Sequence, residues 1–243
     1  MKESVLSVII PAYNEERFIG TLLERVLAVD MSRFGLGKEI IVVDDHSTDG
    51  TADIVAGFEG IIFTRLARNS GKGGAVRTGI SLATGDYIVI QDADLEYDPN
   101  DYVAMMAKLL EDGVDAVYGS RYMRTGKGNW LGGVLRGKRP NQSWGAYLGG
   151  RSLSVVALLC TGRYLTDTVT ALKLFRGDIV KSLRLETTGF ELDHEISAKV
   201  LAGGHTISEV PISYFPRGAE EGKKIGLKDW FRGVRTFVKY RNG

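Results

Sequence analysis

Short apolar runs and stretches of helical periodicity alternate through the first half of the chain. Each apolar run ends in polar, glycine- or proline-containing sequence, which is typical of a buried parallel strand. Between the runs, apolar residues recur every three or four positions, as on one face of an amphipathic helix. This order predicts an α/β protein with a mostly parallel central sheet and helices on both faces. Strands are expected over about 5–10, 39–45, 60–66, 86–92 and 115–122, and helices over about 15–29, 51–58, 73–84 and 99–113.

The second half begins with a change of character. Residues 123–140 contain five glycines, five basic residues and no acids, which predicts a mobile loop over about 123–142. Recognisable core pattern then resumes, with helices expected over about 143–159 and 193–202 and a strand over about 205–215. We therefore expect a single domain, 1–243, with a nucleotide-binding half up to residue 122 and an acceptor half from residue 123.

Composition narrows the class of protein. The 31 basic and 30 acidic residues nearly balance, so no overall charge favours nucleic acid. A single cysteine excludes an internal disulfide framework. The three histidines, His46, His194 and His205, are expected on the surface or in loops. No signal peptide or membrane span is recognised, which predicts a cytoplasmic protein, at most peripheral to a membrane.

Two pairs of carboxylates stand at the ends of apolar runs: Asp44 with Asp45, and Asp92 with Asp94. Ligands of parallel sheets bind beyond the carboxyl ends of the strands, where these acids are expected. Crowded carboxylates favour a cation, and Mg²⁺ or Mn²⁺ shared with substrate phosphates suits an all-oxygen set. Glu96 is a further candidate oxygen ligand. An ordinary acidic turn before a helix is the alternative for the second pair.

Three other segments carry candidate chemistry, and each also has a structural interpretation. Residues 69–79 are rich in glycine and contain Lys72, which favours an anion but also fits a simple turn. Residues 11–15 place Tyr13 for base stacking and Glu15 for hydrogen bonds, or serve as a helix cap. Asp193 and Glu195 lie at a helix start, and two residues two positions apart do not share a helix face. We expect one of them to point to the cleft.

The C-terminal segment indicates an amphipathic helix over about 226–241. Residues 217–241 include eight basic and three acidic residues, while apolar residues recur at helical spacing. Such a helix can lie on an anionic membrane surface or pack its apolar stripe on the protein's own core. We favour the core interpretation slightly.

Taken in order, these motifs resemble family 2 glycosyltransferases of the GT-A fold, a Rossmann-like arrangement, and most of all the dolichyl-phosphate mannose synthase-like branch. The resemblance covers nearly the whole chain. It rests on VIIPAYNEE, VVDDHSTDGT, NSGKGGAVRTG, GDYIVIQDADLEYDP, YGSRY, TDTVTALKLF, EVPISYFPR and EGKKIG.

The resemblance implies a role for each candidate residue. The nucleotide would be held by Pro11, Tyr13, Glu15, Asp44, Asp45, Lys72 and Asp92. Asp92 and Asp94 match the family's DxD motif for Mg²⁺ or Mn²⁺, with Glu96 as a possible third ligand. The donor or acceptor phosphates would be contacted by Arg121, Arg217 and Lys224. Two positions depart from the family pattern: His46 stands where glycine is frequent, and Glu96 stands where glutamine is found in mannose synthases of this branch.

The implied reaction is transfer of a hexose, mannose or glucose, from GDP-mannose or UDP-glucose with inversion at the anomeric carbon. The expected acceptor is a polyprenyl phosphate, which needs no protein base. With a hydroxyl acceptor, Asp193 or Glu195 would be the base, and these two with Asp94 are the candidate catalytic residues. The alternatives are a sugar-nucleotide pyrophosphorylase and a non-enzymatic sugar-nucleotide-binding protein.

Overall fold

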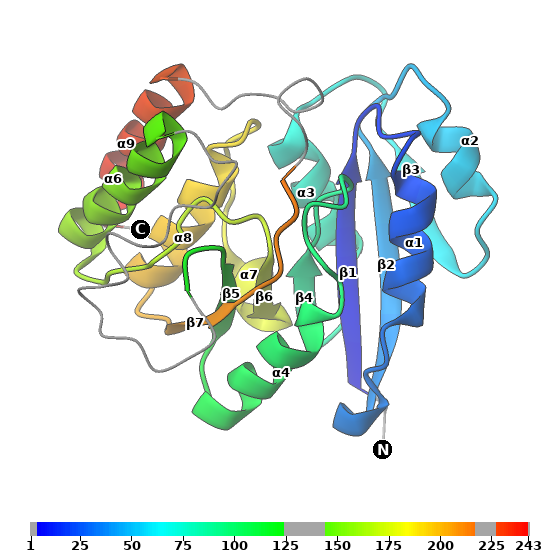
Figure 1. Ribbon diagram of the computed structural model, residues 1–243, viewed down its shortest axis with the longest axis horizontal. Coiled ribbons are helices and arrows are strands. Elements are labelled where there is room, and N and C mark those ends of the chain that lie inside the picture. Colours follow the sequence, from blue (N-terminus) through cyan, green and yellow to red (C-terminus); the bar gives the residue numbers. More distant parts are fainter. Residues whose placement is uncertain (1–3, 124–143, 217–226, 243) are drawn as a thin grey trace.

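The computed structural model describes residues 4–123, 144–216 and 227–242, and its centre is a seven-stranded sheet (Figure 1). The strands lie in the order β3-β2-β1-β4-β6-β5-β7. Their bounds are β1 Ser4–Ala12, β2 Leu36–Asp44, β3 Ile61–Arg65, β4 Tyr87–Ile90, β5 Ala116–Ser120, β6 Lys173–Arg176 and β7 Ile207–Pro211. The sheet confirms the predicted α/β class.

One strand runs against the others. β6 pairs antiparallel with both β4 and β5, whereas all other neighbours in the sheet are parallel. Residues 166–176 carried no assignment from sequence, because a four-residue strand gives almost no periodic pattern. β6 joins the two halves of the sheet, and its first residue, Lys173, is fully buried.

Helices cover both faces of the sheet. Helices α1 (Ile19–Ala28) and α4 (Asp101–Asp112) lie on one face, with the short α2 (Thr51–Ala56) against α1. Helices α3 (Lys72–Leu82), α7 (Gly177–Ser182) and α8 (Leu192–Ala202) cover the other face. The run in strand β1 is apolar throughout because both faces of the strand are buried. Val8 and Ile10 pack into the core that includes α1 and α4, and Ile9 packs into the core that includes α3, α7 and α8.

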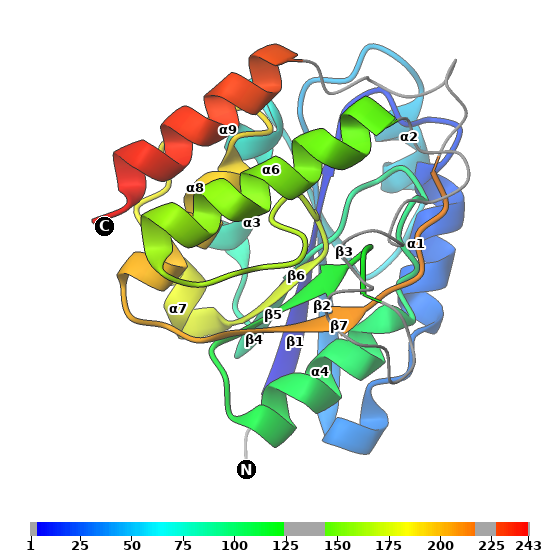
Figure 2. The same ribbon diagram turned by 60° about the vertical axis from the view of Figure 1, so that its left-hand side comes forward.

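A further layer lies outside α8. Helices α6 (Trp144–Thr161) and α9 (Leu227–Tyr240) run side by side there, as Figure 2 shows. Phe237 and Tyr240 bury the inner face of α9, while Leu227, Phe231 and Val238 remain exposed on its outer face. The packing on the protein's own core expected for this helix is therefore present, and an exposed apolar face remains as well. No helix in the described ranges has the length and apolar character needed to span a bilayer.

Element boundaries differ from the expected ones where loops form the site. The helix expected from residue 15 begins at Ile19, because the chain turns at Asn14 with a φ of 56° before entering it. The strand expected over 205–215 is limited to Ile207–Pro211. The loop expected over 123–142 falls almost entirely outside the described residues.

The prediction that all three histidines lie on the surface or in loops is wrong for His194. This residue lies in α8, is 5 % exposed, and contacts the Phe237 ring at 5.3 Å between centroids. Gly233 of α9 lies so close that a Cβ there would approach the imidazole to 2.9 Å. Burial lowers the pKa of His194 from 6.5 to about 4, so the ring is neutral in the folded protein.

Acid should therefore destabilise the protein through His194. Between pH 6.5 and 4 the unfolded chain takes up a proton that the folded imidazole does not, so stability falls as pH falls through this window. The loss approaches about 3 kcal/mol. We expect His194→Gln to reduce the difference in urea-unfolding free energy between pH 7 and pH 5. His46→Gln, at an exposed histidine, is the matched control, and equal pH dependence in both variants would contradict the assignment.

Candidate active site

The loops that follow β1, β2 and β4 meet at one edge of the sheet, because these strands are neighbours and parallel. Each loop contains a non-glycine residue with a positive φ: Asn14 at 56°, His46 at 66° and Leu95 at 59°. Such backbone is costly and collects at functional sites. The left-handed conformation of His46 is one that favours glycine, which accounts for the glycine that is frequent at this position in the family.

Hydrogen bonds between the first two loops fix the expected nucleoside site. The Asn14 amide donates to Ser47 Oγ at 3.0 Å, and the Thr48 amide donates to Asn14 Oδ1 at 2.8 Å. The Glu15 amide donates to Thr51 Oγ1 at 2.8 Å. Tyr13 extends from this tied pair of loops with 46 % of its surface exposed, and Pro11 lies at the end of β1.

Asp44 and Asp45 have different surroundings. Asp44 is fully buried, accepts the Ser47 amide at 3.0 Å and pairs with Arg65 at 3.1 Å between Nε and Oδ2. Asp45 accepts the Ser70 amide at 2.6 Å and thereby joins the glycine-rich segment to the end of β2. Burial raises the pKa of Asp45 despite this hydrogen bond. Asp44 therefore organises its own loop, and Asp45 links two loops of the site.

A chain of four charges crosses the site, with Lys173 and Asp193 buried and Lys72 and Asp92 partly exposed. Lys72 Nζ lies 2.8 Å from Asp92 and 3.2 Å from Asp193, and Lys173 Nζ lies 2.7 Å from the other oxygen of Asp193. Burial alone would raise the pKa of Asp193, but the charges of Lys173 and Lys72 outweigh it and hold that pKa below its usual value. Burial likewise opposes the charge of Lys72, yet Asp193 and Asp92 keep its pKa above the ordinary value.

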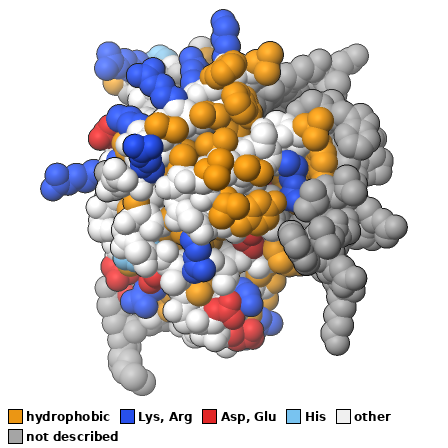
Figure 3. Space-filling model, turned by 90° about the vertical axis from the view of Figure 1, so that its left-hand side faces the viewer, with side chains coloured by type: hydrophobic (Ala, Val, Ile, Leu, Met, Phe, Trp, Pro, Cys, Tyr) orange, Lys and Arg blue, Asp and Glu red, His pale blue; other side chains and the backbone are white. Residues whose placement is uncertain are grey.

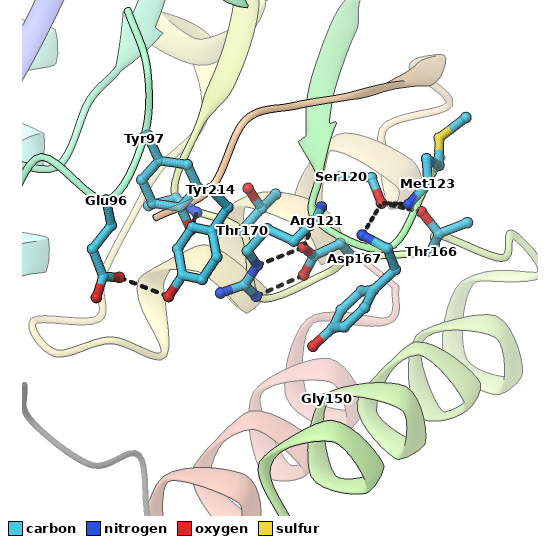
Figure 4. A network of polar contacts seen from close by, with 12 residues as sticks. Glu96, Tyr97, Ser120, Arg121, Met123, Gly150, Thr166, Asp167, Thr170 and Tyr214 are labelled. Carbon is cyan, nitrogen blue, oxygen red and sulfur yellow. Dashed lines mark hydrogen bonds and ion pairs between the residues drawn. The ribbon is translucent and has the colours of Figure 1, made fainter. Parts of the chain in front are cut away.

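The second acidic pair lies beside this chain. Asp94 Oδ1 accepts the Glu96 amide at 3.1 Å across the turn at Leu95. The Glu96 carboxylate accepts a hydrogen bond from the Tyr214 hydroxyl at 2.7 Å, and the Tyr97 and Tyr214 rings pack at a tilt of 54° with their centroids 5.3 Å apart (Figure 4). Glu96 thus fastens the segment after β7 to this loop.

Asp92 and Asp94 fit a divalent ion that also binds phosphate. Mg²⁺ typically takes one or two carboxylates and completes its shell with substrate phosphates and water. Within the described ranges, no three histidine, cysteine, aspartate or glutamate side chains are grouped closely enough to hold a metal by themselves. Two carboxylates at the end of β4 match the shared kind of site.

Glu195 lies away from the other acids. Its side chain is fully buried and accepts the backbone amides of Glu186 and Thr187, both at 2.8 Å, and the Lys199 ammonium at 2.7 Å. Burial would raise its pKa, but these hydrogen bonds hold the pKa below the ordinary value. As expected from their spacing, only one of the two acids, Asp193, joins the charged chain.

Arg121 has a partner that the sequence did not reveal. Its guanidinium binds Asp167 through two hydrogen bonds of 2.7 and 2.8 Å, and its carbon lies 5.2 Å from the centre of the Tyr214 ring (Figure 4). Glu209 accepts the Thr166 and Asp167 amides and so supports this arrangement. The aspartate stands in the quoted TDT motif, but no spacing rule connects it to an arginine 46 positions earlier. Arg217 and Lys224 lie outside the described residues.

Residues 7–164 match the model of glycosyl transferase family 2. The chain belongs to this family. It is 34 % identical over 251 residues to dodecaprenyl-phosphate galacturonate synthase of Rhizobium johnstonii, covering 97 % of this chain and 68 % of that one. It is 31 % identical over 242 residues to dolichol-phosphate mannosyltransferase of Pyrococcus furiosus, covering 97 % of this chain and 64 % of that one. The chain thus spans about two thirds of these relatives.

Solved structures confirm the fold. Mannosyl-3-phosphoglycerate synthase from Rubrobacter xylanophilus superposes with a TM-score of 0.73 at 19 % identity, covering 97 % of this chain and 73 % of that one. Glucosyl-3-phosphoglycerate synthase from Mycobacterium tuberculosis, in complex with Mn²⁺, uridine diphosphate and glucosyl-3-phosphoglycerate, gives 0.67 at 20 % identity, covering 98 % and 80 %. The GT-A fold and the glycosyltransferase class expected from the motifs are confirmed, and the pyrophosphorylase and binding-protein alternatives give way to them.

The chain of four charges should also contribute to the unfolding free energy of the protein. Asp193→Asn leaves Lys173 buried without its counter-ion, and we expect a loss of about 3 kcal/mol in unfolding free energy. Adding Lys173→Met removes the buried cation and should recover most of that loss. Asp178→Asn, at an exposed carboxylate 3.6 Å from Arg176, is the matched control and should change stability by less than about 0.5 kcal/mol. Urea unfolding measures all four proteins; equal stability of Asp193→Asn and the control would refute the pairing.

Proposed function

We propose that the protein is an inverting, metal-dependent glycosyltransferase that moves a hexose from a nucleotide sugar to a polyprenyl phosphate. We infer the acceptor class from the surroundings of Asp193 and Glu195, the two acids considered as general bases. Asp193 is bound by two lysines, and Glu195 is fully buried under hydrogen bonds, with both pKa values lowered. Neither carboxylate is therefore suited to act as the general base for a hydroxyl acceptor. A phosphate oxygen is already anionic and needs no base.

The two relatives support the same acceptor class. One is named for dodecaprenyl phosphate and the other for dolichol phosphate, both polyprenyl phosphates, while their sugars are galacturonate and mannose. The sugar therefore varies among relatives that share a lipid phosphate. A hexose from GDP-mannose or UDP-glucose remains our proposal for the donor.

The metal proposed for this site is Mg²⁺ or Mn²⁺, held by Asp92 and Asp94. When bound, such an ion supplies positive charge to the donor diphosphate and so stabilises it as a leaving group. Glu96 is engaged with Tyr214 and contributes through that contact to the shape of the loop. The Mn²⁺ complex of glucosyl-3-phosphoglycerate synthase supports a divalent ion in this fold.

The chain's own residues hold the donor and balance the charge of the leaving group. An acceptor phosphate oxygen forms a bond to the anomeric carbon as the bond from that carbon to the diphosphate breaks, and the electron pair leaves with the diphosphate. Lys72, held between Asp92 and Asp193, supplies an ammonium close to that charge. Arg121 is kept charged and oriented by Asp167 to bind a phosphate.

For the nucleoside, the proposal assigns the loops after β1 and β2. Tyr13 presents an exposed ring for stacking on the base, and Pro11 and Glu15 flank it. Asp45 lies where these loops meet the glycine-rich segment. Asp44 acts through its contacts with Ser47 and Arg65, which set the shape of the loop.

The exposed face of α6 and α9 suits contact with an anionic membrane surface. Leu159 is 80 % exposed and Phe231 is 64 % exposed, and Leu148 and Val155 of α6 and Leu227 and Val238 of α9 are exposed as well. Figure 3 shows the side of the molecule on which α6 and α9 lie, where hydrophobic side chains gather and lysines and arginines lie nearby. Trp230 donates to Ser152 Oγ at 2.8 Å and so fixes α9 against α6. We propose that this face lies on the membrane that holds the lipid acceptor.

Metal-dependent donor binding is the first test. We expect Asp94→Ala to lose Mn²⁺-dependent binding of GDP or UDP in calorimetry, because the remaining carboxylate cannot hold the ion and the diphosphate together. Asp53→Ala, an exposed acid of α2, should bind as the wild type does. If Asp94→Ala also binds as the wild type does, the site assignment is wrong. With GDP-mannose, UDP-glucose and UDP-galacturonate as donors, transfer to polyprenyl phosphate but not to polyprenol would support the proposed acceptor.

Membrane contact is tested by flotation with vesicles that contain an anionic lipid. We expect the wild type to float with them and the double variant Leu159→Ser/Phe231→Ser to lose most of that binding, since it removes two exposed apolar side chains. Leu110→Ser, an exposed leucine of α4 on the other side of the sheet, should float like the wild type. A wild type that stays with the unbound fraction would overturn the membrane proposal.

A further inference from the structure

Residues 184–188, which connect α7 to α8, lie across the first turn of α3. The Gly73 amide donates to the Thr188 carbonyl at 2.7 Å. A Cβ at Gly71 would collide with the Thr188 carbonyl, and a Cβ at Gly73 would collide with the Thr187 carbonyl. The segment therefore fits against a backbone that only glycine allows, on both sides of Lys72. We call residues 184–188 the clamp segment.

The first turn of α3 has little support of its own. Its N-cap is Gly71, with a φ of 76° and no side-chain hydrogen bond to the helix, and two of the first three helical residues are glycines. Glycine stabilises a helix less than alanine does, because it loses more backbone freedom when the helix forms. Lys72, whose ammonium pairs with Asp92 and Asp193, stands in this weak turn. Something outside the helix must hold the turn in place.

Glu195 anchors the clamp segment through both oxygens of its carboxylate. Its Oε1 accepts the Glu186 amide at 2.8 Å and the Lys199 ammonium at 2.7 Å. Its Oε2 accepts the Thr187 amide at 2.8 Å and the Thr187 hydroxyl at 2.6 Å. From the other side, Arg77 of α3 donates to the carbonyls of residues 185 and 186 at 3.2 and 3.0 Å. All four contacts of Glu195 use a charged, buried carboxylate.

We infer that Glu195 is a positioning residue: it anchors the clamp segment on the first turn of α3 and thereby fixes Lys72 for the donor diphosphate. This inference rests on the proposed function of Lys72. Asp193, which binds the Lys72 ammonium, lies on the same helix two residues earlier. Helix α8 thus sets the Lys72 side chain through Asp193 and the Lys72 backbone through Glu195.

Glu195→Gln tests this role with little change of volume. An amide replaces one carboxylate oxygen with a donor, which then faces donors, so about half of the anchoring contacts become repulsive. We expect the affinity for GDP or UDP with Mn²⁺, whichever the wild type binds, to fall roughly tenfold. Glu186→Gln is the matched control, because its side chain contacts Lys239 and Tyr240 while its backbone amide still reaches Glu195. It should bind like the wild type.

A double-mutant cycle separates positioning of Lys72 from a general structural role. In a Lys72→Met background, Glu195→Gln should lower nucleotide affinity less than twofold, since the side chain that it positions is gone. A tenfold loss in both backgrounds, or no loss in either, would overturn the inference. A wild type that binds no nucleotide would instead refute the proposed function itself, and with it this role of Lys72.

Lysine acetylation followed by mass spectrometry gives a second measurement that needs no nucleotide. Lys72 has only 11 % of its side chain exposed, and we expect Glu195→Gln to raise its labelling several-fold while labelling of Lys108 on α4 stays constant. Thr187→Val removes one anchoring hydroxyl and is the milder variant should Glu195→Gln not fold. Unchanged Lys72 labelling in a folded variant of either kind would contradict the anchoring role.

Discussion

The site depends on how one lysine is shared between two aspartates. Lys72 joins Asp92, at the end of β4, to Asp193, at the start of α8, and Lys173 from the antiparallel strand β6 pairs with the other oxygen of Asp193. Burying any one of these charges alone would cost several kcal/mol. The four charges lie together, two positive and two negative, so the attraction between opposite charges offsets the cost of removing each one from water. These ion pairs also fix four separate elements, α3, the end of β4, β6 and α8, relative to one another at the edge of the sheet where the donor is proposed to bind.

This arrangement has a consequence for the proposed metal. Asp92 has a counter-ion at 2.8 Å without any metal, so a divalent ion on Asp92 and Asp94 would share Asp92 with Lys72. Lys72 would keep Asp193 as its partner and remain charged, because Asp193 holds its pKa high. Under the proposed function, its ammonium would then lie close to the donor diphosphate.

The sequence predicted the parts of the structure that long patterns encode. The alternation of apolar runs and helices gave the parallel sheet, and the positions of Asp92, Asp94 and Lys72 followed from strand ends and a glycine-rich turn. The sequence did not predict one short strand or the buried polar contacts. Strand β6 has only four residues, and Asp167 reaches Arg121 through the fold and not through spacing. Most of helix α8 is buried, which its sequence did not reveal. Asp193 and Glu195 were expected at a helix start and His194 on the surface or in a loop, whereas each faces a different neighbour in the protein interior.

Helix α8 connects the two surfaces that the proposed reaction needs. On one side Asp193 and Glu195 determine where Lys72 lies. On the other side His194 packs against Phe237 of α9, and α8 approaches α9 closely at Gly233, where a Cβ would lie 2.9 Å from the imidazole. Helix α8 therefore links α9, whose outer face is apolar and exposed, to the Lys72 side chain at the proposed donor site. Under the proposed function, the enzyme must hold a water-soluble sugar donor and a lipid phosphate at a fixed separation, and α8 is an element that contacts both the proposed donor site and the helix of the proposed membrane face.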